Sequence, residues 1–404
     1  MKIITNEITM IDGSVGIVID TDKYKLFKSD DYNFFFNKKD GFFVRWGNRK
    51  GTEKPKIVSG ASLMIYKIWT DFFGKIDLKE FLMDLETDGN MYQFLPEIAD
   101  IELSTSCHGV KGIGPCSFCY KSNHPQINGE GNMSLDTFKK LFNKLIPTIT
   151  QIAFGITDID ANPDMWEIFN YCRNNGVIPN VTINGDRMAP ELFDKLASTM
   201  GAVAVSFYNK NLTYNAIKEL TNRGMKQCNI HYMLSTETYD NAFKLMKDIK
   251  TDSRLKSLNA LVFLSLKKKG RSVDNAYSIL SNEKFKNIVD YALNNNIPIG
   301  FDSCTQPKFV KVIQSRPNAK NIEKYTESCE STLNSLYINS LGFFYPCSFS
   351  ENVKNAPGDW SEGINVLEID NFMKDVWLAK KTRDFANITI NNKTCGIACP
   401  IYQI

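Results

Sequence analysis

The chain has 404 residues, of which 43% are hydrophobic and 23% charged, and its 48 basic and 45 acidic side chains leave a formal net charge of +3. This balance lacks the footprint of a strong nucleic-acid-binding protein. The sequence shows neither a membrane-spanning apolar run nor the apolar region of a signal peptide near its start, so we expect a cytoplasmic protein without a membrane partner.

Residues 1–96 carry strand-like runs followed by helical patterns. We predict strands at 32–36 and 41–46, joined through Asn37 to Gly41, a segment with the Asn, Asp and Gly typical of hairpins. Amphipathic patterns then predict helices at 61–73 and 78–85. The sequence therefore predicts an N-terminal α+β domain over residues 1–96.

From residue 97 to residue 324, short β-branched or apolar runs alternate with helical patterns. This alternation predicts an α/β fold in which a parallel sheet forms a partial (β/α)6 TIM-like barrel. Ser134 is the expected N-cap of the first helix, Pro190 begins a later one, and Gly224 ends another. The expected strands are 101–104, 152–155, 178–183, 202–207, 228–234, 258–266 and 297–301.

Three of the ten cysteines cluster directly after the first expected barrel strand. Cys107, Cys116 and Cys119 follow the carboxyl end of this strand, which is the end of a parallel barrel at which active sites lie. Three thiolates suit a [4Fe–4S] cluster whose fourth iron stays open for a ligand. Three cysteines with His108 or His124 also suit a structural zinc ion, so the motif by itself leaves both interpretations open.

The residues around this motif resemble the radical S-adenosylmethionine (radical SAM) superfamily. The resemblance rests on the run from Glu102 to Cys107 and on Cys116 to Tyr120, with Phe118 in the family's aromatic position. The spacing C-x8-C-x2-C departs from the usual C-x3-C-x2-C by five loop residues. The resemblance implies catalytic roles for Cys107, Cys116 and Cys119 as ligands of a cluster that reductively cleaves S-adenosylmethionine, giving a 5′-deoxyadenosyl radical that abstracts hydrogen.

The same resemblance implies cofactor-binding residues at later strand ends. Thr157 or Asp158 takes the place of the family's glutamate that binds the methionyl amino group, and Asn184 and Ser206 end the third and fourth strands. Each of these positions also has an explanation that involves no cofactor. Thr157, Asp158 and Ser206 fit ordinary capping positions equally well. Arg271, after the sixth strand, fits a solvated turn, and His231, on an expected barrel strand, fits a core position. The implied cofactor-binding set is Phe118, Tyr120, Gly155, Thr157, Asn184, Ser206 and Arg271.

The C-terminal residues 325–404 contain a second group of cysteines: Cys329, Cys347, Cys395 and Cys399. The strand–turn–strand pattern of residues 336–347 and the closing cysteine pair resemble the Twitch or SPASM extension of radical SAM enzymes. This resemblance implies an auxiliary [4Fe–4S] cluster on these four cysteines. A four-cysteine zinc ribbon is the alternative, and Cys304 is a fifth candidate ligand. Cys172 and Cys228 fit buried hydrophobic positions.

The resemblance implies an oxidoreductase or peptide-modifying enzyme whose substrate is a peptide or protein side chain. Residues 1–96 are then a candidate substrate-recognition domain, and an electron donor such as flavodoxin or ferredoxin is expected. Radical chemistry on a small molecule, such as a sugar or nucleoside, is the first alternative. A zinc-stabilised binding protein without catalysis is the second.

Overall fold

The structure is a computed structural model. The residues that it describes are 3–10, 12–30, 32–47, 60–85, 95–126, 129–159, 161–274, 277–323, 326, 328–394 and 399–402.

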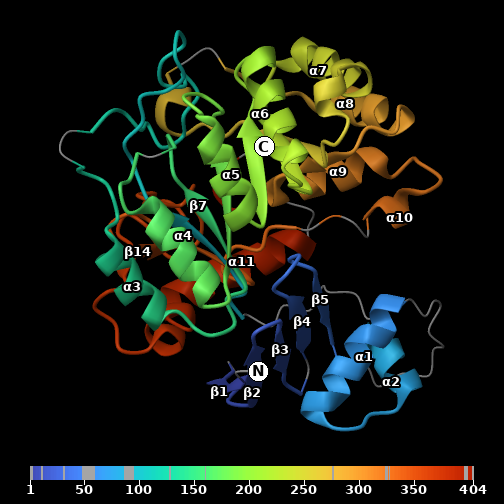
Figure 1. The fold of residues 1–404 in the computed structure, drawn as a ribbon, viewed down its shortest axis with the longest axis vertical. Helices are drawn as coiled ribbons and strands as arrows, with labels where there is room; N and C mark the ends of the chain where they lie inside the picture. Colours follow the sequence, from blue (N-terminus) through green and yellow to red (C-terminus); the bar gives the residue numbers. More distant parts are fainter. Residues whose placement is uncertain are drawn as a thin grey trace.

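The N-terminal domain is an antiparallel five-stranded sheet in the order β1-β2-β3-β4-β5, covered on one face by two helices (Figure 1). The predicted strands and helices are present, but β1 to β3 were not predicted. Trp46 of the sheet packs against Trp69 and Phe81 of the helices, which fixes the two layers together. The bounds are β1 Ile3–Thr9, β2 Val15–Thr21, β3 Tyr24–Lys28, β4 Asn33–Asn37, β5 Phe43–Trp46, α1 Gly60–Phe73 and α2 Leu78–Leu85.

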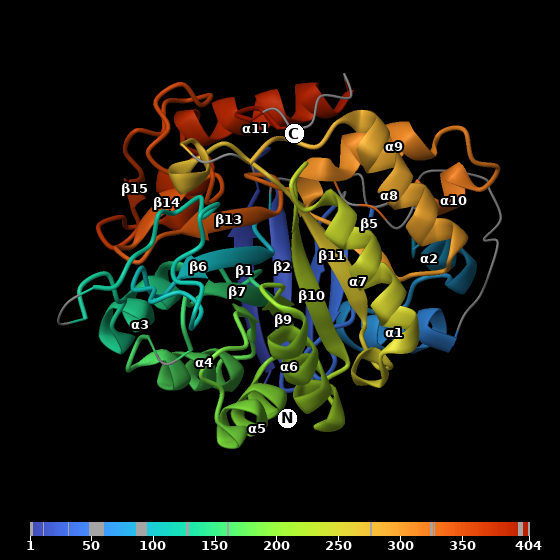
Figure 2. The same cartoon turned by 90° about the horizontal axis from the view of Figure 1, so that it is seen from above.

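Seven parallel strands, β6 to β12, form the predicted partial barrel, each pairing with the next along the chain. Figure 2 shows these strands as an arc with the crossover helices outside it. The strand bounds are β6 Ile98–Glu102, β7 Gln151–Gly155, β8 Ile178–Ile183, β9 Ala202–Ser206, β10 Gln227–Leu234, β11 Ala260–Ser265 and β12 Ile299–Phe301.

The barrel helices begin and end largely where the sequence predicts. Ser134 caps the first helix by accepting a hydrogen bond from the Thr137 amide, and Pro190 opens α5. Gly224 has φ +87°, a left-handed conformation that suits glycine after a helix. The bounds are α3 Leu135–Lys144, α4 Met165–Asn174, α5 Pro190–Thr199, α6 Lys210–Asn222, α7 Tyr239–Thr251, α8 Asn282–Asn294, α9 Gln306–Ile313 and α10 Ala319–Glu323; short 3₁₀ turns span Ser253–Leu255 (η1), Gly270–Ser272 (η2) and Ser303–Thr305 (η3).

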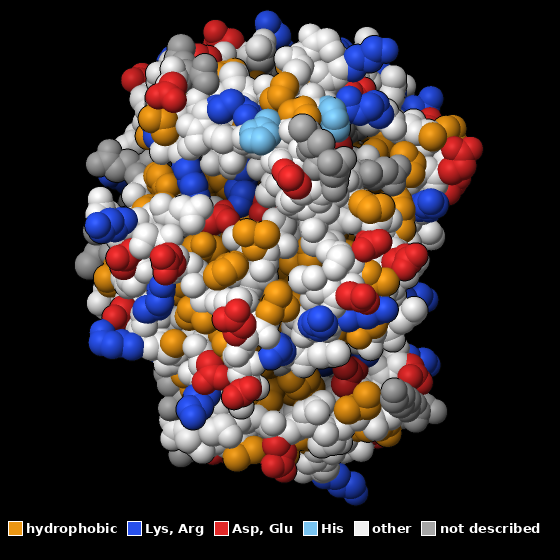
Figure 3. Space-filling view, turned by 90° about the vertical axis from the view of Figure 1, so that its left-hand side faces the viewer, with side chains coloured by type: hydrophobic (Ala, Val, Ile, Leu, Met, Phe, Trp, Pro, Cys, Tyr) orange, Lys and Arg blue, Asp and Glu red, His pale blue; other side chains and the backbone are white. Residues whose placement is uncertain are grey.

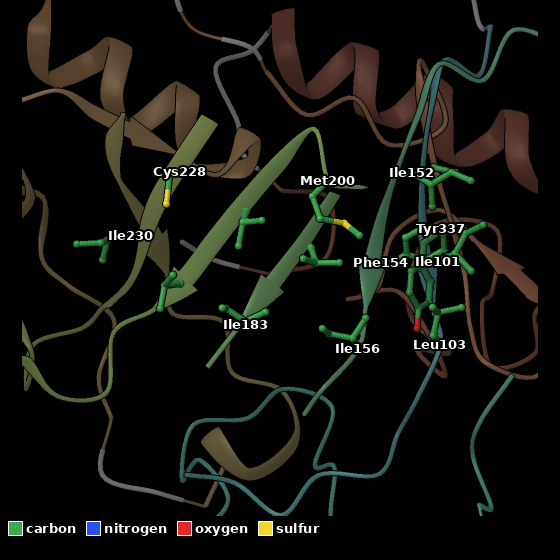
Figure 4. Close-up of a cluster of buried hydrophobic side chains, with 14 of the residues drawn as sticks. Ile101, Leu103, Ile152, Phe154, Ile156, Ile183, Met200, Cys228, Ile230 and Tyr337 are labelled. Carbon is green, nitrogen blue, oxygen red and sulfur yellow. The ribbon is translucent and has the colours of Figure 1, made fainter. Parts of the chain in front are cut away.

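The main hydrophobic core lies between the barrel strands and their helices. Side chains from neighbouring strands, among them Ile101, Phe154 and Ile183, are buried side by side (Figure 4). Cys172 and Cys228 are fully buried in this core, as predicted for small hydrophobic side chains. The core thus fixes the strand ends from which the polar residues of the site project.

The C-terminal strands continue the barrel sheet. Strand β13 (Ser335–Ile338) pairs in parallel with β6, and β14 (Phe343–Tyr345) and β15 (Ile364–Asn365) follow it antiparallel. A π-helical turn, Met373–Trp377 (η4), and α11 (Lys380–Thr394) complete this region. The C-terminal extension is therefore joined edge to edge with the first barrel strand, beside the cysteine loop.

Within the described residues, no helix combines the length and apolarity needed to cross a membrane. Figure 3 shows basic and acidic side chains interspersed over the face that it views. That face carries no extended patch of a single charge, in keeping with the near-neutral composition.

Candidate active site

A pocket of about 420 Å³ lies at the carboxyl ends of the barrel strands, and Cys107, Cys116 and Cys119 all line it. Five further residues of the predicted cofactor-binding set line the same pocket: Tyr120, Gly155, Thr157, Asn184 and Ser206. These residues come from the cysteine loop and from the ends of β7, β8 and β9, which are far apart in the sequence. The fold thus brings most of the predicted set into one cavity.

The two remaining residues of that set lie elsewhere. Phe118 packs edge to face on Tyr277, with ring centroids 5.5 Å apart. Arg271 donates from Nε to the Cys116 carbonyl oxygen at 2.8 Å and from Nη1 to the Asn123 carbonyl oxygen at 2.9 Å. Neither side chain is among the described residues lining the pocket, so each supports the cysteine loop from outside.

The cysteine loop folds back on itself through its glycines. Gly109 has φ +72°, and a Cβ there would lie 2.0 Å from the Gly114 carbonyl carbon. The Val110 amide donates to the Gly114 carbonyl oxygen at 3.2 Å and so closes a small internal turn. The longer spacing between Cys107 and Cys116 is therefore accommodated in a compact turn and not in an extended loop.

Asp158 anchors this loop to the barrel. Its carboxylate is 4% exposed and accepts the His108 backbone amide at 2.6 Å. It also accepts Asn184 Nδ2 at 2.9 Å and an Arg187 guanidinium nitrogen at 3.0 Å. Asp158 is thus occupied by protein groups, and it holds the β7 and β8 strand ends against the start of the cysteine loop.

Thr157 and Ser206 also make contacts within the protein. Thr157 has φ +58°, a strained conformation for a β-branched residue, and its hydroxyl donates to the Ser106 carbonyl oxygen. Ser206 hydrogen-bonds the hydroxyl of Tyr208, which lies 3.1 Å from Cys116 Sγ. Tyr208 is a site residue that the sequence did not predict, because nothing in the local pattern links it to a cysteine 92 positions earlier.

The three pocket thiols are free of disulfides and close enough to influence one another. Burial raises the pKa of Cys107 and of Cys116, and neighbouring thiols of the trio raise both further. Among the described residues, no three His, Cys, Asp or Glu side chains surround one metal-ion position.

A second group of thiols lies near the C-terminal extension. The Cys304 thiol lies close enough to the thiols of Cys329 and Cys399 for them to shift its pKa, and Cys399 in the same way affects the pKa of Cys347. Cys304, whose role the sequence left open, thus contacts the C-terminal cysteines. Cys395 lies outside the described residues.

Lys267 lies beside this second group and is 4% exposed. Burial opposes its charge, but the ion pair with Asp302 and the nearby thiols Cys304 and Cys399 together raise the pKa of Lys267 above its usual value. The positive charge next to Cys304 and Cys399 favours the thiolate form, which is the form that binds iron, whereas contact between the thiols and burial raise the pKa of both.

A buried polar network joins the cysteine loop to the C-terminal extension. Lys121 lies between Glu102 of β6, at 3.2 Å, and Glu351 beyond β14. The Tyr337 hydroxyl of β13 lies 2.8 Å from Lys121 Nζ and 3.3 Å from Glu102. The sequence did not predict this network, because Lys121 and Glu351 are 230 positions apart.

Comparisons with solved structures identify the fold. SuiB of Streptococcus suis, bound to the precursor peptide SuiA, aligns with a TM-score of 0.56 and 13% identity over 89% of this chain and 90% of its own. SuiB bound to S-adenosylmethionine aligns with a TM-score of 0.54 and 14% identity over 89% of each chain. The protein anSMEcpe, with bound AdoMet and the Cp18Cys peptide, aligns with a TM-score of 0.52 and 16% identity over 73% of this chain and 84% of its own.

SuiB and anSMEcpe are radical SAM enzymes, so this chain has the radical SAM fold, as the sequence resemblance implied. No protein-family model matches the sequence. No curated protein matches it either.

Proposed function

We propose that this protein is a radical SAM enzyme that modifies a peptide or protein side chain. The observation that carries the proposal is the convergence of three free thiols from one loop with four barrel strand ends on a single pocket. In this proposal, Cys107, Cys116 and Cys119 hold the catalytic [4Fe–4S] cluster, and S-adenosylmethionine binds beside it in the pocket. The cluster and cofactor together supply a 5′-deoxyadenosyl radical that abstracts hydrogen from the substrate.

The residues present fit this cofactor pair. The donor set is three thiols of one loop that lie near enough to affect one another's pKa, and three thiolates are the number that a cluster with one open iron takes. Asp158, Arg271 and the loop glycines fix the backbone that carries the thiols. Gly155, Asn184 and Ser206 line the pocket beside them as the proposed cofactor contacts, while Thr157 holds the loop through Ser106.

A peptide substrate is the favoured choice. Support comes from SuiB and anSMEcpe, two proteins of the same fold, each of which has a solved structure with a peptide bound. The N-terminal domain is our candidate for recognising that peptide. Arg45 of β5 makes ion pairs with Glu97 at 3.1 Å and Glu330 at 3.4 Å, which fix this domain to the junction of barrel and extension.

For the auxiliary [4Fe–4S] cluster we propose Cys304, Cys329, Cys347 and Cys399 as ligands. The contacts among these thiols and the neighbouring Lys267 support this set. Cys395, the remaining ligand of the sequence-based set, becomes an alternative to one of them.

Two measurements test this proposal. The protein is reconstituted with iron and sulfide without oxygen, and the electron paramagnetic resonance spectrum of the reduced protein is recorded with and without S-adenosylmethionine. The spectrum of the cluster on Cys107, Cys116 and Cys119 is expected to change on adding the cofactor; a protein that takes up zinc but no iron would refute the assignment.

The substrate class is tested with deuterium. Side-chain-deuterated peptides are compared with deuterated sugars and nucleosides, and 5′-deoxyadenosine is analysed by mass spectrometry. Deuterium transfer from a peptide supports the proposal. Transfer from a sugar or nucleoside instead establishes the small-molecule alternative.

A further inference from the structure

One carboxylate in the reaction pocket has no assigned role. Asp100 lies on β6, opposite Ala153 of β7 and Tyr337 of β13. Its strand neighbours Ala99 and Ile101 are fully buried in the hydrophobic core, whereas Asp100 is exposed at the wall of the pocket. This alternation follows from the two-residue period of a strand, so Asp100 faces the barrel interior.

Asp100 lies deeper in the barrel than the proposed cofactor residues. Glu102 is level with Gly155 at the strand ends, and Asp100 precedes Glu102 by two residues on the same strand. This difference corresponds to roughly 7 Å along the strand. The charge of Asp100 still reaches the phenol of Tyr120, next to the ligand Cys119, where it helps raise the pKa of that phenol.

The other charged side chains that line the pocket are already paired. Glu102 and Lys121 form an ion pair at 3.2 Å, and Lys121 is shared with Glu351. His231, on β10, is kept neutral at physiological pH because burial lowers its pKa to about 4. Within the part of the chain that the structure describes, Asp100 has neither a hydrogen bond from a side chain nor an ion pair.

We propose that Asp100 binds a positively charged group of the substrate, an ammonium or a guanidinium, inside the barrel and deeper than the residues proposed to bind the cofactor. This inference rests on the proposed function and specifies the substrate class of the same pocket. Asp100 is open to the pocket, so a ligand that enters the barrel can reach its carboxylate, and an ammonium or guanidinium group would form a charge-assisted hydrogen bond with it.

The charges of the other side chains that line the pocket also favour a cationic ligand. Lys121 pairs with both Glu102 and Glu351, so among the described residues that line the pocket Asp100 is the carboxylate that no protein cation pairs. An anionic substrate group near Asp100 would be repelled, and a neutral apolar group would leave the carboxylate without compensation. A cationic group of the substrate therefore binds more favourably beside Asp100 than an anionic or an apolar group.

The test uses the reconstituted holoprotein with S-adenosylmethionine and three small probes. Nα-acetyl-lysine methylamide and Nα-acetyl-arginine methylamide carry the two cations, and Nα-acetyl-norleucine methylamide is their neutral counterpart. Dissociation constants are measured by saturation-transfer nuclear magnetic resonance at pH 7.5 for the wild type, Asp100→Asn and the exposed control Asp240→Asn.

One of the cationic probes is expected to bind the wild type and Asp240→Asn roughly tenfold more tightly than the neutral probe, the size expected for a hydrogen bond to a charged group. Asp100→Asn should lose this preference and keep its iron content and its affinity for S-adenosylmethionine. Which cationic probe binds more tightly distinguishes an ammonium from a guanidinium ligand.

Equal binding of charged and neutral probes, or no binding of either cation, overturns the proposal. So does a loss of S-adenosylmethionine affinity in Asp100→Asn, since Asp100 would then serve the cofactor. Failure of the wild type to assemble a cluster or to bind S-adenosylmethionine is a different result and counts against the proposed function itself.

Discussion

The Tyr208 hydroxyl oxygen lies 3.1 Å from Cys116 Sγ. Burial raises the pKa of Tyr208, so the phenol keeps its proton, and Ser206 hydrogen-bonds the same hydroxyl. With Cys116 as a thiolate ligand, the phenol is a hydrogen-bond donor to its sulfur. Such a bond stabilises the more negative, reduced cluster and raises its reduction potential.

Tyr208→Phe is therefore expected to lower the reduction potential of the catalytic cluster while leaving its iron content unchanged. A redox titration followed by electron paramagnetic resonance measures the effect. Tyr214→Phe is the control, because its hydroxyl bonds Asp248 at 2.9 Å, on the helical layer. An unchanged or higher potential in Tyr208→Phe would show that the contact does not affect the cluster.

Gly270 allows η2 to pack against the cysteine loop. Its φ is +60°, and a Cβ there would lie 2.6 Å from the Cys119 carbonyl oxygen and 2.5 Å from that of Tyr120. The next residue, Arg271, donates its amide to the Cys119 carbonyl oxygen at 3.0 Å. Gly270→Ala should push the loop away and lower the iron bound after reconstitution.

Gly224→Ala is the matched control for this change. Gly224 also has a positive φ, of +87°, but a Cβ there would have no atom within 4 Å. The Gly224→Ala variant should have a free energy of unfolding lower by about 1 kcal/mol and an unchanged iron content. Equal iron content in both variants would contradict the packing argument.

Cys304 is expected to be a ligand of the auxiliary cluster. In a Cys107→Ala/Cys116→Ala/Cys119→Ala background, the iron that remains belongs to the second site, about four atoms per chain. Adding Cys304→Ser should remove most of it, whereas adding Cys228→Ala at a buried core thiol should not. Retention of all four iron atoms in the Cys304→Ser variant would reassign this ligand, with Cys395 as the next candidate.

His231 should contribute to acid sensitivity. Its folded-state pKa is lowered to about 4 by burial, partly offset by Asp302, against an unfolded value near 6.5. Between these values the unfolded chain binds more protons than the folded one, so this contribution to stability is present above pH 6.5 and is lost as the pH falls towards 4.

His231→Gln should therefore flatten the fall of the melting temperature between pH 6.5 and pH 4, because glutamine does not titrate. Thermal unfolding of the metal-free protein at pH 7.5, 6 and 4.5 measures this. The control His124→Gln changes an exposed histidine. A fall equally steep in both variants would show that His231 is not the source.

The barrel was predictable because its strands and helices carry strong periodic patterns. The strand at 178–183 was predicted with its observed bounds, and Ser134 caps its helix as expected. Strands β1 to β3 were missed, although five of the seven residues of β2 are β-branched. Cys107, Cys116 and Cys119 share a loop, so their grouping follows directly from the sequence.

The rest of the site depends on tertiary contacts. Neither Tyr208 beside Cys116 nor Cys304 beside Cys399 follows from sequence spacing, because the fold sets both contacts. The resemblance made Arg271 a candidate cofactor residue, with a solvated turn as the alternative, and neither interpretation included the bonds from its guanidinium to loop carbonyl oxygens. Local patterns cannot show which partner a long side chain reaches.

Formation of 5′-deoxyadenosine is the decisive test of the proposed radical chemistry. The wild-type protein and Cys116→Ala are reconstituted without oxygen and given S-adenosylmethionine and a strong reductant. We expect 5′-deoxyadenosine from the wild type and none from the variant. A wild-type protein that binds its full complement of iron and S-adenosylmethionine yet forms no 5′-deoxyadenosine, or forms only as much as Cys116→Ala, would contradict the assignment of these cysteines to a radical SAM cluster.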